Sequence, residues 1–314
     1  MAKKLTYEEM ADKLRASNSI LHVCHASADL DAAGSAYGSQ RAFGGQIHLG
    51  KAPKIFATNL YEYLGVKTID EPIFSDFETI VVYDTPDECL LPSPFVDEWF
   101  LIDHHPKSSA IKKCSAYLLR NQQSCCQVVD KLIQKAGVSF DAQLAIAIAA
   151  GILGDTRYLR IAKPQTLHRF AALLGLAKLD LGELKRIIDG PATREKATEF
   201  AEVFKSFQQW DCNGMLIGMA QTNTHAAAFE MANTMIGKGF DLLLAVISNK
   251  AGDSCLRFLE VSDNLRQKIS VSRLIKDIAS DVKSPSCWGG GVHCPFSRQA
   301  LTEYLHSSLG RLLR

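Results

Sequence analysis

Residues 20–36 read ILHVCHASADLDAAGSA, and this stretch decides the fold. Its first five residues are apolar apart from one histidine, which is typical of a strand buried on both faces of a sheet. From Asp31 onward, small residues open a helix that runs toward Phe43. A buried strand followed at once by a helix is the repeating unit of a parallel sheet. We therefore expect His25 at the carboxyl end of a strand, where ligands gather in α/β folds.

The pattern repeats toward residue 160 and predicts an α/β fold with a parallel sheet. We expect further strands at Lys54–Ala57, Thr79–Tyr83 and Phe100–Ile102, the last two ending at Asp84 and Asp103. Parallel strands end at the same edge of a sheet, so these acidic residues should lie near His25.

The rest of the chain predicts a helical region and then a second α/β unit. Residues 124–176 read as helical, and the glycines at 151 and 154 should break the helix just before Asp155. The predicted elements of the second unit are strands at Met215–Ala220, Asp241–Ser248 and Cys255–Val261 and helices at Asn223–Ile236 and Val271–Ala279. We expect a first domain at residues 1–190, a helical linker at 191–212 and a second domain at 213–314.

Composition limits the possible functions. The 314 residues carry 35 Lys and Arg against 34 Asp and Glu, and a net charge of +1 argues against a general nucleic-acid binder with a broad basic face. Nine cysteines without a Cys-x-x-Cys motif indicate reduced, mostly buried thiols and a cytoplasmic protein. The longest apolar run, Leu144–Leu153, is too short to span a membrane, and the N-terminus does not resemble a signal peptide.

Four motifs together predict a metal site. They contain five carboxylates and three histidines: His25, Asp29, Asp31, Asp84, Asp103, His104, His105 and Asp155. A single Asp after a strand can be only a helix cap, but four such clusters favour a shared site. Crowded carboxylates stay ionised only if cations neutralise them, and two metals about 3.5–4 Å apart can clamp the attacking and leaving oxygens of a phosphoryl displacement. Mixed Asp and His ligation suits two Mn²⁺ ions, with Mg²⁺ or Co²⁺ possible.

The motif His25-x-x-x-Asp29-x-Asp31-x-x-Gly34-Ser35, the later Asp84, Asp103-His104-His105 and Gly154-Asp155-Thr156 resemble those of the DHH–DHHA1 phosphoesterases. The resemblance covers nearly the whole chain. It implies a parallel-sheet DHH domain, a smaller C-terminal α/β DHHA1 domain and an active site in the cleft between them.

The resemblance also implies roles for the acidic and histidine residues. His25, Asp29 and Asp84 would hold one metal, and Asp31, Asp84, His104 and Asp155 the other, with Asp84 bridging. Asp103 would orient His104, and His105 would contact the scissile phosphate, so that Asp84, Asp103 and His105 are the predicted catalytic residues.

Substrate contacts are expected mainly in the second domain. By the same resemblance, Arg257, Gly290, Gly291 and His293 would hold the nucleotide end of the substrate. Arg257 could instead be a cross-strand surface charge, and the glycines a flexible turn. The sequence departs from the family pattern in three places. Ala28 replaces a common proline, and Val292 is inserted before the histidine. Arg157 stands where glycine is common and would add a phosphate contact or narrow the pocket.

The leading hypothesis is a phosphodiesterase that cleaves very short oligonucleotides, especially 5′-phosphorylated dinucleotides, to mononucleotides, in the manner of a nanoRNase. A second domain of roughly 100 residues and little surplus positive charge argue against a RecJ-like single-strand exonuclease. A 3′-phosphoadenosine 5′-phosphate phosphatase, a pyrophosphatase or an exopolyphosphatase would share the metal set. A non-catalytic nucleotide sensor is the alternative outside enzymes. The expected partner is a short oligonucleotide or dinucleotide, with no long duplex and no membrane.

Overall fold

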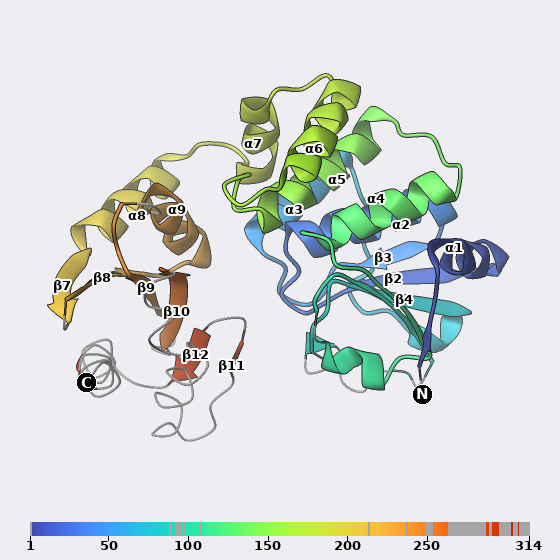
Figure 1. Ribbon diagram of the computed structural model, residues 1–314, viewed down its shortest axis with the longest axis horizontal. Helices are drawn as coiled ribbons and strands as arrows, with labels where there is room; N and C mark the ends of the chain where they lie inside the picture. The colour runs from blue at the N-terminus through green and yellow to red at the C-terminus, as the bar shows by residue number, and fades with distance from the viewer. Residues whose placement is uncertain are drawn as a thin grey trace. The chain divides into compact units, whose positions relative to one another are not determined.

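The structure is a computed structural model that describes residues 2–87, 90–91, 96, 98–106, 108–212, 214–235, 238–248, 254–262, 287–288, 291–294, 303 and 307. The chain divides into two units, Met1–Pro191 and Ala192–Arg314. Each unit contains one six-stranded sheet, with helices packed against it (Figure 1).

The sheet of the first unit is parallel throughout, as the sequence predicts. Its strand order is β1-β6-β5-β4-β2-β3, and every neighbouring pair is parallel. The strands are β1 (Lys3–Lys4), β2 (Ile20–Cys24), β3 (Gln46–His48), β4 (Thr79–Tyr83), β5 (Phe100–Asp103) and β6 (Ala116–Leu119). The predicted strands at 20–24, 79–83 and 100–102 are confirmed, because central strands of this kind are apolar on both faces.

The two faces of this sheet have different covers. On one face, Ile20, Val81 and Ile102 belong to the main core, which also contains buried residues of the helices. On the other face, Leu21 and Val82 pack with residues of the short 3₁₀ segments η1 (Phe74–Asp76) and η3 (Ser109–Lys112). The helices of this unit are α1 (Tyr7–Ala16), α2 (Leu30–Phe43), α3 (Ile55–Leu64), α4 (Cys125–Lys135), α5 (Ala142–Asp155), α6 (Pro164–Ala177) and α7 (Leu181–Asp189).

Helices α2 and α5 approach each other closely, and two glycines permit this. A Cβ added to Gly34 of α2 would lie 2.4 Å from the carbonyl oxygen of Ala147 in α5, and one added to Gly151 of α5 would lie 2.9 Å from Oδ1 of Asp31 in α2 and 2.2 Å from Sγ of Cys126 in α4. Such distances are far below ordinary contact, so only glycine fits at either position. The close approach brings the first turn of α2 and the last turn of α5, which carry Asp31 and Asp155, to one place.

Two predictions for this unit are wrong. Lys54–Ala57 is not a strand; α3 begins at Ile55, and the strand lies earlier, at Gln46–His48. A short apolar run does not distinguish strand from helix by itself. The glycines at 151 and 154 do not break the helix, since α5 continues through them to Asp155. Their role is close packing against neighbouring helices.

The second unit has a mixed sheet with the order β11-β12-β10-β9-β8-β7, in which only β8 and β9 pair in parallel. Its elements are α8 (Arg194–Lys205), β7 (Gln208–Cys212), β8 (Met215–Thr222), α9 (His225–Met235), β9 (Leu242–Ser248), β10 (Ser254–Val261), β11 (Cys287–Trp288) and β12 (Gly291–Cys294). The three strands and the first helix predicted here are confirmed, whereas the predicted helix at 271–279 lies outside the described residues. The predicted linker, residues 191–212, contains α8 and β7, and β7 pairs with β8.

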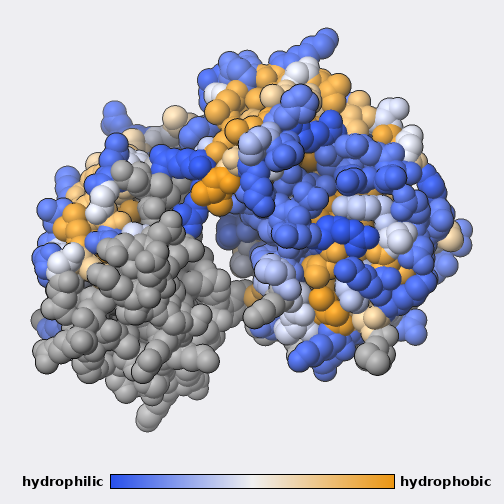
Figure 2. Space-filling model, in the orientation of Figure 1, coloured by the Kyte–Doolittle hydropathy of each residue, from blue (hydrophilic) through white to orange (hydrophobic). Residues whose placement is uncertain are grey.

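Surface and thiol properties are ordinary. Hydrophobic side chains reach the surface over α6 and α7, where Leu167, Leu176 and Leu181 are exposed (Figure 2). Single exposed leucines are common on protein surfaces and indicate no site.

Four cysteines whose side chains are described are buried and form no disulfide bond. In the described part of the chain, no helix combines the length and apolar character needed to cross a membrane.

Candidate metal centre

The predicted ligands converge at the carboxyl edge of the parallel sheet. His25 follows β2, Asp84 follows β4, and Asp103 is the last residue of β5, directly before His104. Asp29 and Asp31 lie at the start of α2, and Asp155 ends α5. Six of these side chains, those predicted as metal ligands, fall into two groups that meet at Asp84 and His104.

The first group contains His25, Asp29 and Asp84, each of which offers a ligand atom within 4.8 Å of the others. Asp29 is the N-cap of α2, and its Oδ1 accepts hydrogen bonds from the backbone N–H groups of Asp31 and Ala32 at 3.2 and 3.3 Å. Its Oδ2 accepts from the Lys54 ammonium at 3.0 Å. Burial acts to raise the pKa of Asp29, but the positive charges of Lys54 and His25 outweigh it and hold the pKa well below its usual range. The Asp29 carboxylate is therefore ionised and ready to bind a cation.

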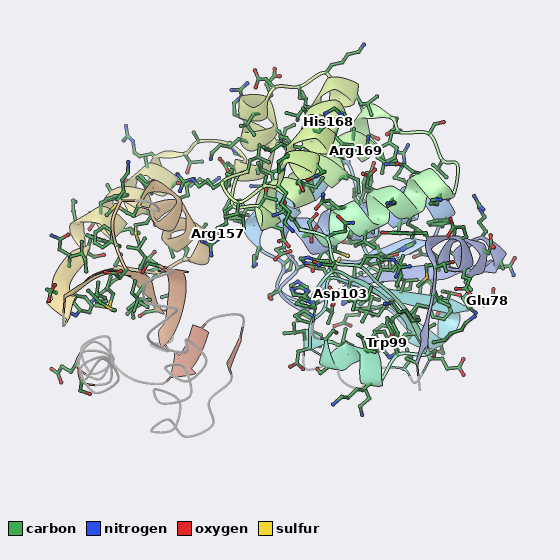
Figure 3. All side chains as sticks on the ribbon, in the orientation of Figure 1. Glu78, Trp99, Asp103, Arg157, His168 and Arg169 are labelled. Atoms are coloured by element: carbon green, nitrogen blue, oxygen red, sulfur yellow. The ribbon has the colours of Figure 1, made fainter. Side chains whose placement is uncertain are left out.

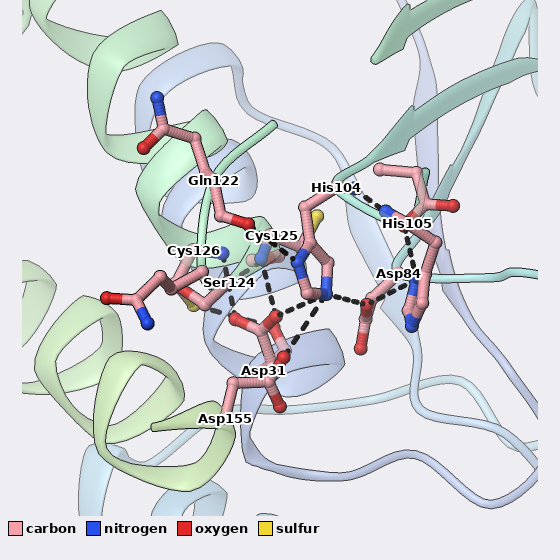
Figure 4. A network of polar contacts seen from close by, with 12 residues as sticks. Asp31, Asp84, His104, His105, Gln122, Ser124, Cys125, Cys126 and Asp155 are labelled. Atoms are coloured by element: carbon pink, nitrogen blue, oxygen red, sulfur yellow. Dashed lines mark hydrogen bonds and ion pairs between the residues drawn. The ribbon is translucent and has the colours of Figure 1, made fainter. Parts of the chain in front are cut away.

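The second group contains Asp31, His104 and Asp155, and Asp84 also reaches it. Figure 4 shows how the carboxylates lie around Nε2 of His104. This nitrogen lies 3.1 Å from Oδ2 of Asp155, 3.3 Å from Oδ1 of Asp84 and 3.8 Å from Oδ2 of Asp31. Burial raises the pKa of Asp155 to about 6, and the Asp84 charge adds to this effect. Three carboxylates around one imidazole nitrogen form an oxygen-rich site with one nitrogen ligand, a donor set suited to Mn²⁺ or Mg²⁺.

Asp31 is fixed by the N-terminus of helix α4. Its carboxylate accepts the backbone N–H groups of Cys125 and Cys126 at 2.5 and 2.8 Å. Burial, with the charges of Asp155 and Asp84, raises the pKa of Asp31 well above its usual range. The dipole of helix α4 partly stabilises the negative charge of Asp31, but a cation would relieve the remaining repulsion between the carboxylates of Asp31, Asp84 and Asp155.

The tautomer of His104 follows from its other nitrogen. Nδ1 lies 3.2 Å from the carbonyl oxygen of Gln122, which can only accept, so Nδ1 carries the hydrogen. Nε2 then faces the carboxylates, where it can ligate a metal or carry a proton. Burial acts to lower the pKa of His104, but hydrogen bonds to Asp155 and Asp84 outweigh it and raise the pKa to about 12. Without a metal the ring is thus an imidazolium.

Asp103 accepts hydrogen bonds from the two histidines that follow it, but it does not contact the His104 ring as predicted. Its Oδ1 accepts the backbone N–H groups of His104 and His105 at 2.7 and 3.3 Å and binds Nδ1 of His105 at 2.8 Å. The predicted orienting effect on the His104 ring comes instead from Gln122. Sequence reasoning missed this residue because the contact uses a backbone carbonyl, which any residue supplies. The ring held by Asp103 is that of His105, which is 34% exposed.

Buried polar atoms without hydrogen-bond partners mark the centre. Among the described residues, Oδ2 of Asp103 has no hydrogen-bond partner, and Oδ1 of Asp84 and Nε2 of His104 face each other at 3.3 Å without the geometry of a hydrogen bond. Buried polar groups are normally paired, so unpaired ones at one place point to a missing ion. Asp84 also has a φ of 52°, a left-handed conformation that is uncommon outside glycine and is found at functional sites. The residues present therefore fit a divalent metal centre with Asp84 in the middle.

The predicted substrate residues are only partly described. Arg157 lies two residues after Asp155 in a turn where residues 157–159 all have φ between 51 and 68° (Figure 3). Arg257 is in β10, and the strand register places it opposite Gly291 of β12, with Cys255 opposite His293. Gly290 lies outside the described residues. The substrate contacts of these residues, and the predicted substrate cleft, stay predictions.

Comparison with known proteins supports the fold. No family model matches the chain. The uncharacterized protein MJ0988 of Methanocaldococcus jannaschii is 20% identical over 299 residues, which cover 90% of this chain and 89% of that protein. Among solved structures, an exopolyphosphatase-related protein from Bacteroides fragilis matches with a TM-score of 0.73 at 15% identity, covering 97% of this chain and 96% of that one.

RecJ from Thermus thermophilus, solved in complex with Mn²⁺, matches with a TM-score of 0.53 at 12% identity. The match covers 97% of this chain but 55% of the RecJ chain. The chain therefore shares the fold of these two proteins, which agrees with the resemblance of its four motifs to the DHH phosphoesterases. The predicted α/β fold, with a parallel sheet in the first unit, is confirmed.

Proposed function

We propose that this protein is a two-metal phosphodiesterase that hydrolyses very short oligonucleotides, especially 5′-phosphorylated dinucleotides, to mononucleotides. The observation that carries the proposal is the convergence of six ligand side chains from four separate segments around Asp84 and His104. Two bound Mn²⁺ ions would supply a nucleophile at neutral pH and neutralise charge on the phosphoryl group.

The protein's own residues would orient the reacting groups. Asp103 fixes Nδ1 of His105, which leaves the half-exposed ring with one nitrogen to donate to a phosphate oxygen. In the metal-free protein, burial acts to lower the pKa of His105, but the hydrogen bond and charge of Asp103 outweigh it and raise the pKa. A hydrogen-bond donor held in place beside the metals would stabilise negative charge that develops on the phosphoryl oxygens.

Short substrates are favoured by charge. The chain has a net charge of +1, whereas binding long single strands requires a positively charged groove with stacking aromatic residues. The RecJ chain of the same fold is nearly twice as long as the part that this chain matches. We therefore rank a RecJ-like exonuclease below a dinucleotide hydrolase.

An exopolyphosphatase is the second candidate. It is favoured by the match to the exopolyphosphatase-related protein, which covers nearly all of both chains. A pyrophosphatase and a 3′-phosphoadenosine 5′-phosphate phosphatase would use the same metal chemistry. A non-catalytic sensor ranks last, because every predicted metal ligand lies at the site.

The test is a Mn²⁺-supported digestion followed by chromatography. The panel contains a 5′-phosphorylated diribonucleotide, a 24-mer, 3′-phosphoadenosine 5′-phosphate, pyrophosphate and polyphosphate. We expect selective conversion of the dinucleotide to mononucleotides. Preference for another compound would overturn the substrate assignment but retain the metal mechanism, and inactivity on all five would favour the sensor.

Arg257 provides a test of the second unit. Arg257→Ala should raise KM for the dinucleotide and leave kcat nearly unchanged, because a planar guanidinium suits phosphate binding. Arg194→Ala, at the exposed start of α8 in the same unit, is the matched control. Wild-type KM and kcat in Arg257→Ala would mean that Arg257 is only a surface charge.

A further inference from the structure

A loop that the sequence motifs do not include lies against the first metal group. Residues 49–54 connect β3 to α3 and run beside residues 25–29. The backbone N–H of Ala52 donates to the carbonyl of Ala26, and that of Lys54 to the carbonyl of Ala28, both at 2.8 Å. Gly50 has a φ of 89°, and a Cβ there would lie 2.4 Å from the carbonyl oxygen of His25. The loop is thus closely fitted to the segment that carries His25 and Asp29.

This loop places the positive charge of Lys54 beside Asp29, at the edge of the first metal group. Nζ of Lys54 lies 3.0 Å from Oδ2 of Asp29, and the lysine side chain is 42% exposed. Helix α3 begins at the next residue, Ile55, so the positive end of its dipole lies at the same place. The ammonium therefore contacts a predicted metal ligand on one side and solvent on the other.

We infer that Lys54 is a further substrate-binding residue, which contacts a phosphate oxygen beside the group formed by His25, Asp29 and Asp84. The inference rests on the proposed function only in that the centre must receive a phosphoryl group. A metal ion and the Lys54 ammonium compete for the Asp29 carboxylate, because both are cations and the 3.0 Å contact of Lys54 is a direct hydrogen bond.

Once displaced, the ammonium stays within reach of the centre, because the backbone hydrogen bond from Lys54 to Ala28 fixes the point from which its side chain extends. There it presents three N–H donors to an arriving anion, and lysine binds phosphate as a point charge. In the metal-free protein Lys54 thus neutralises Asp29, and in the loaded protein it binds substrate.

Two matched variants test the inference. Lys54→Met keeps the length of the stem and removes the charge. Lys51→Met removes a charge from the same loop, and Lys51 is exposed and has no ion pair among the described residues. Calorimetry would measure Mn²⁺ binding to each protein and then binding of inorganic phosphate to the Mn²⁺-loaded form. KM and kcat would be measured on the best substrate of the panel.

We expect Lys54→Met to weaken phosphate binding and raise KM at least about tenfold, as the loss of one hydrogen bond to a charged group predicts. Its Mn²⁺ affinity should equal or exceed that of the wild type, because a competing cation is gone. Lys51→Met should match the wild type, and Lys54→Arg should largely restore phosphate binding. Weaker Mn²⁺ binding with unchanged phosphate binding would show that Lys54 only orders Asp29, and would overturn the inference, as would no change at all.

The phosphate measurement separates this inference from the substrate proposal. If the wild type fails to cleave the dinucleotide but Lys54→Met still loses phosphate affinity, the substrate proposal fails and the role of Lys54 stands. If the wild type cleaves the dinucleotide and Lys54→Met keeps its phosphate affinity, the substrate proposal stands and the role of Lys54 fails.

Discussion

Metal affinity should depend steeply on pH because of His104. Its Nδ1 faces the Gln122 carbonyl at 3.2 Å, and its Nε2 faces three carboxylates at 3.1–3.8 Å. In the metal-free protein both nitrogens therefore carry hydrogens, consistent with a pKa of about 12. A metal can bind Nε2 only after the proton there has left, so the proton and the metal compete.

The sign and size of the effect follow directly. Because the pKa of His104 lies far above neutral, the metal-free ring is protonated throughout pH 6.5–8.5, and each Mn²⁺ bound there releases at least one proton. Affinity should rise about tenfold for each unit of pH, which is roughly 2.7 kcal/mol over this range. Near pH 6, Asp155 adds a second competing proton, since its pKa is about 6.

Isothermal titration calorimetry with Mn²⁺ in two buffers of different protonation enthalpy would count the released protons. His104→Gln is the matched variant, because it keeps a polar side chain but cannot hold the proton. We expect weaker binding and about one fewer proton released in this variant. A pH-independent Mn²⁺ affinity in the wild type, or equal proton release in both proteins, would refute the assignment of Nε2 as a ligand.

Three other predictions concern the site and its support. Asp84→Asn should lower turnover by more than about 100-fold, because both metal groups lose the carboxylate that they share. Asparagine tolerates the φ of 52°, so the fold should persist. The digestion assay would measure the loss of turnover, and circular dichroism would check the fold. Gly151→Ala should destabilise the protein by about 1–3 kcal/mol in urea unfolding, since the new methyl meets Cys126 at 2.2 Å, whereas Gly175→Ala on α6, with open space around it, should be neutral or stabilising. His22 has its pKa lowered by burial from 6.5 to about 4, so the unfolded state binds its proton first and stability falls as pH drops below 6.5. About 2 kcal/mol should be lost between pH 7 and 5 in the metal-free wild type but not in a His22→Gln variant, and equal losses would contradict this account.

The strands that precede the predicted ligands could be predicted because their continuous apolar runs indicate burial on both faces. Ile20–Cys24 and Thr79–Tyr83 are apolar on both faces, as only central parallel strands are, and their carboxyl ends meet at one edge. The ligand types follow from the same logic, since a cluster of Asp and His after such strands has few structural roles. The convergence of these side chains could therefore be predicted from the sequence.

What could not be predicted depends on contacts between distant segments. Strands β1 and β6 are too short and too weakly patterned to stand out, and their register joins Lys3 to Ala116. Gly151 was interpreted as a helix break because the sequence does not show the sulfur atom of Cys126 that faces it. The contact of Lys54 with Asp29 joins two loops 25 residues apart and has no local signal.

The six predicted metal ligands all come from the first unit, from His25 to Asp155, and none from the second sheet. The metal chemistry is therefore encoded separately from the segment predicted to select the substrate. Substitutions in the second unit would leave all six predicted ligands unchanged. Such an arrangement would allow one metal centre to acquire new specificities over evolutionary time, and an exopolyphosphatase-related protein and RecJ share this fold.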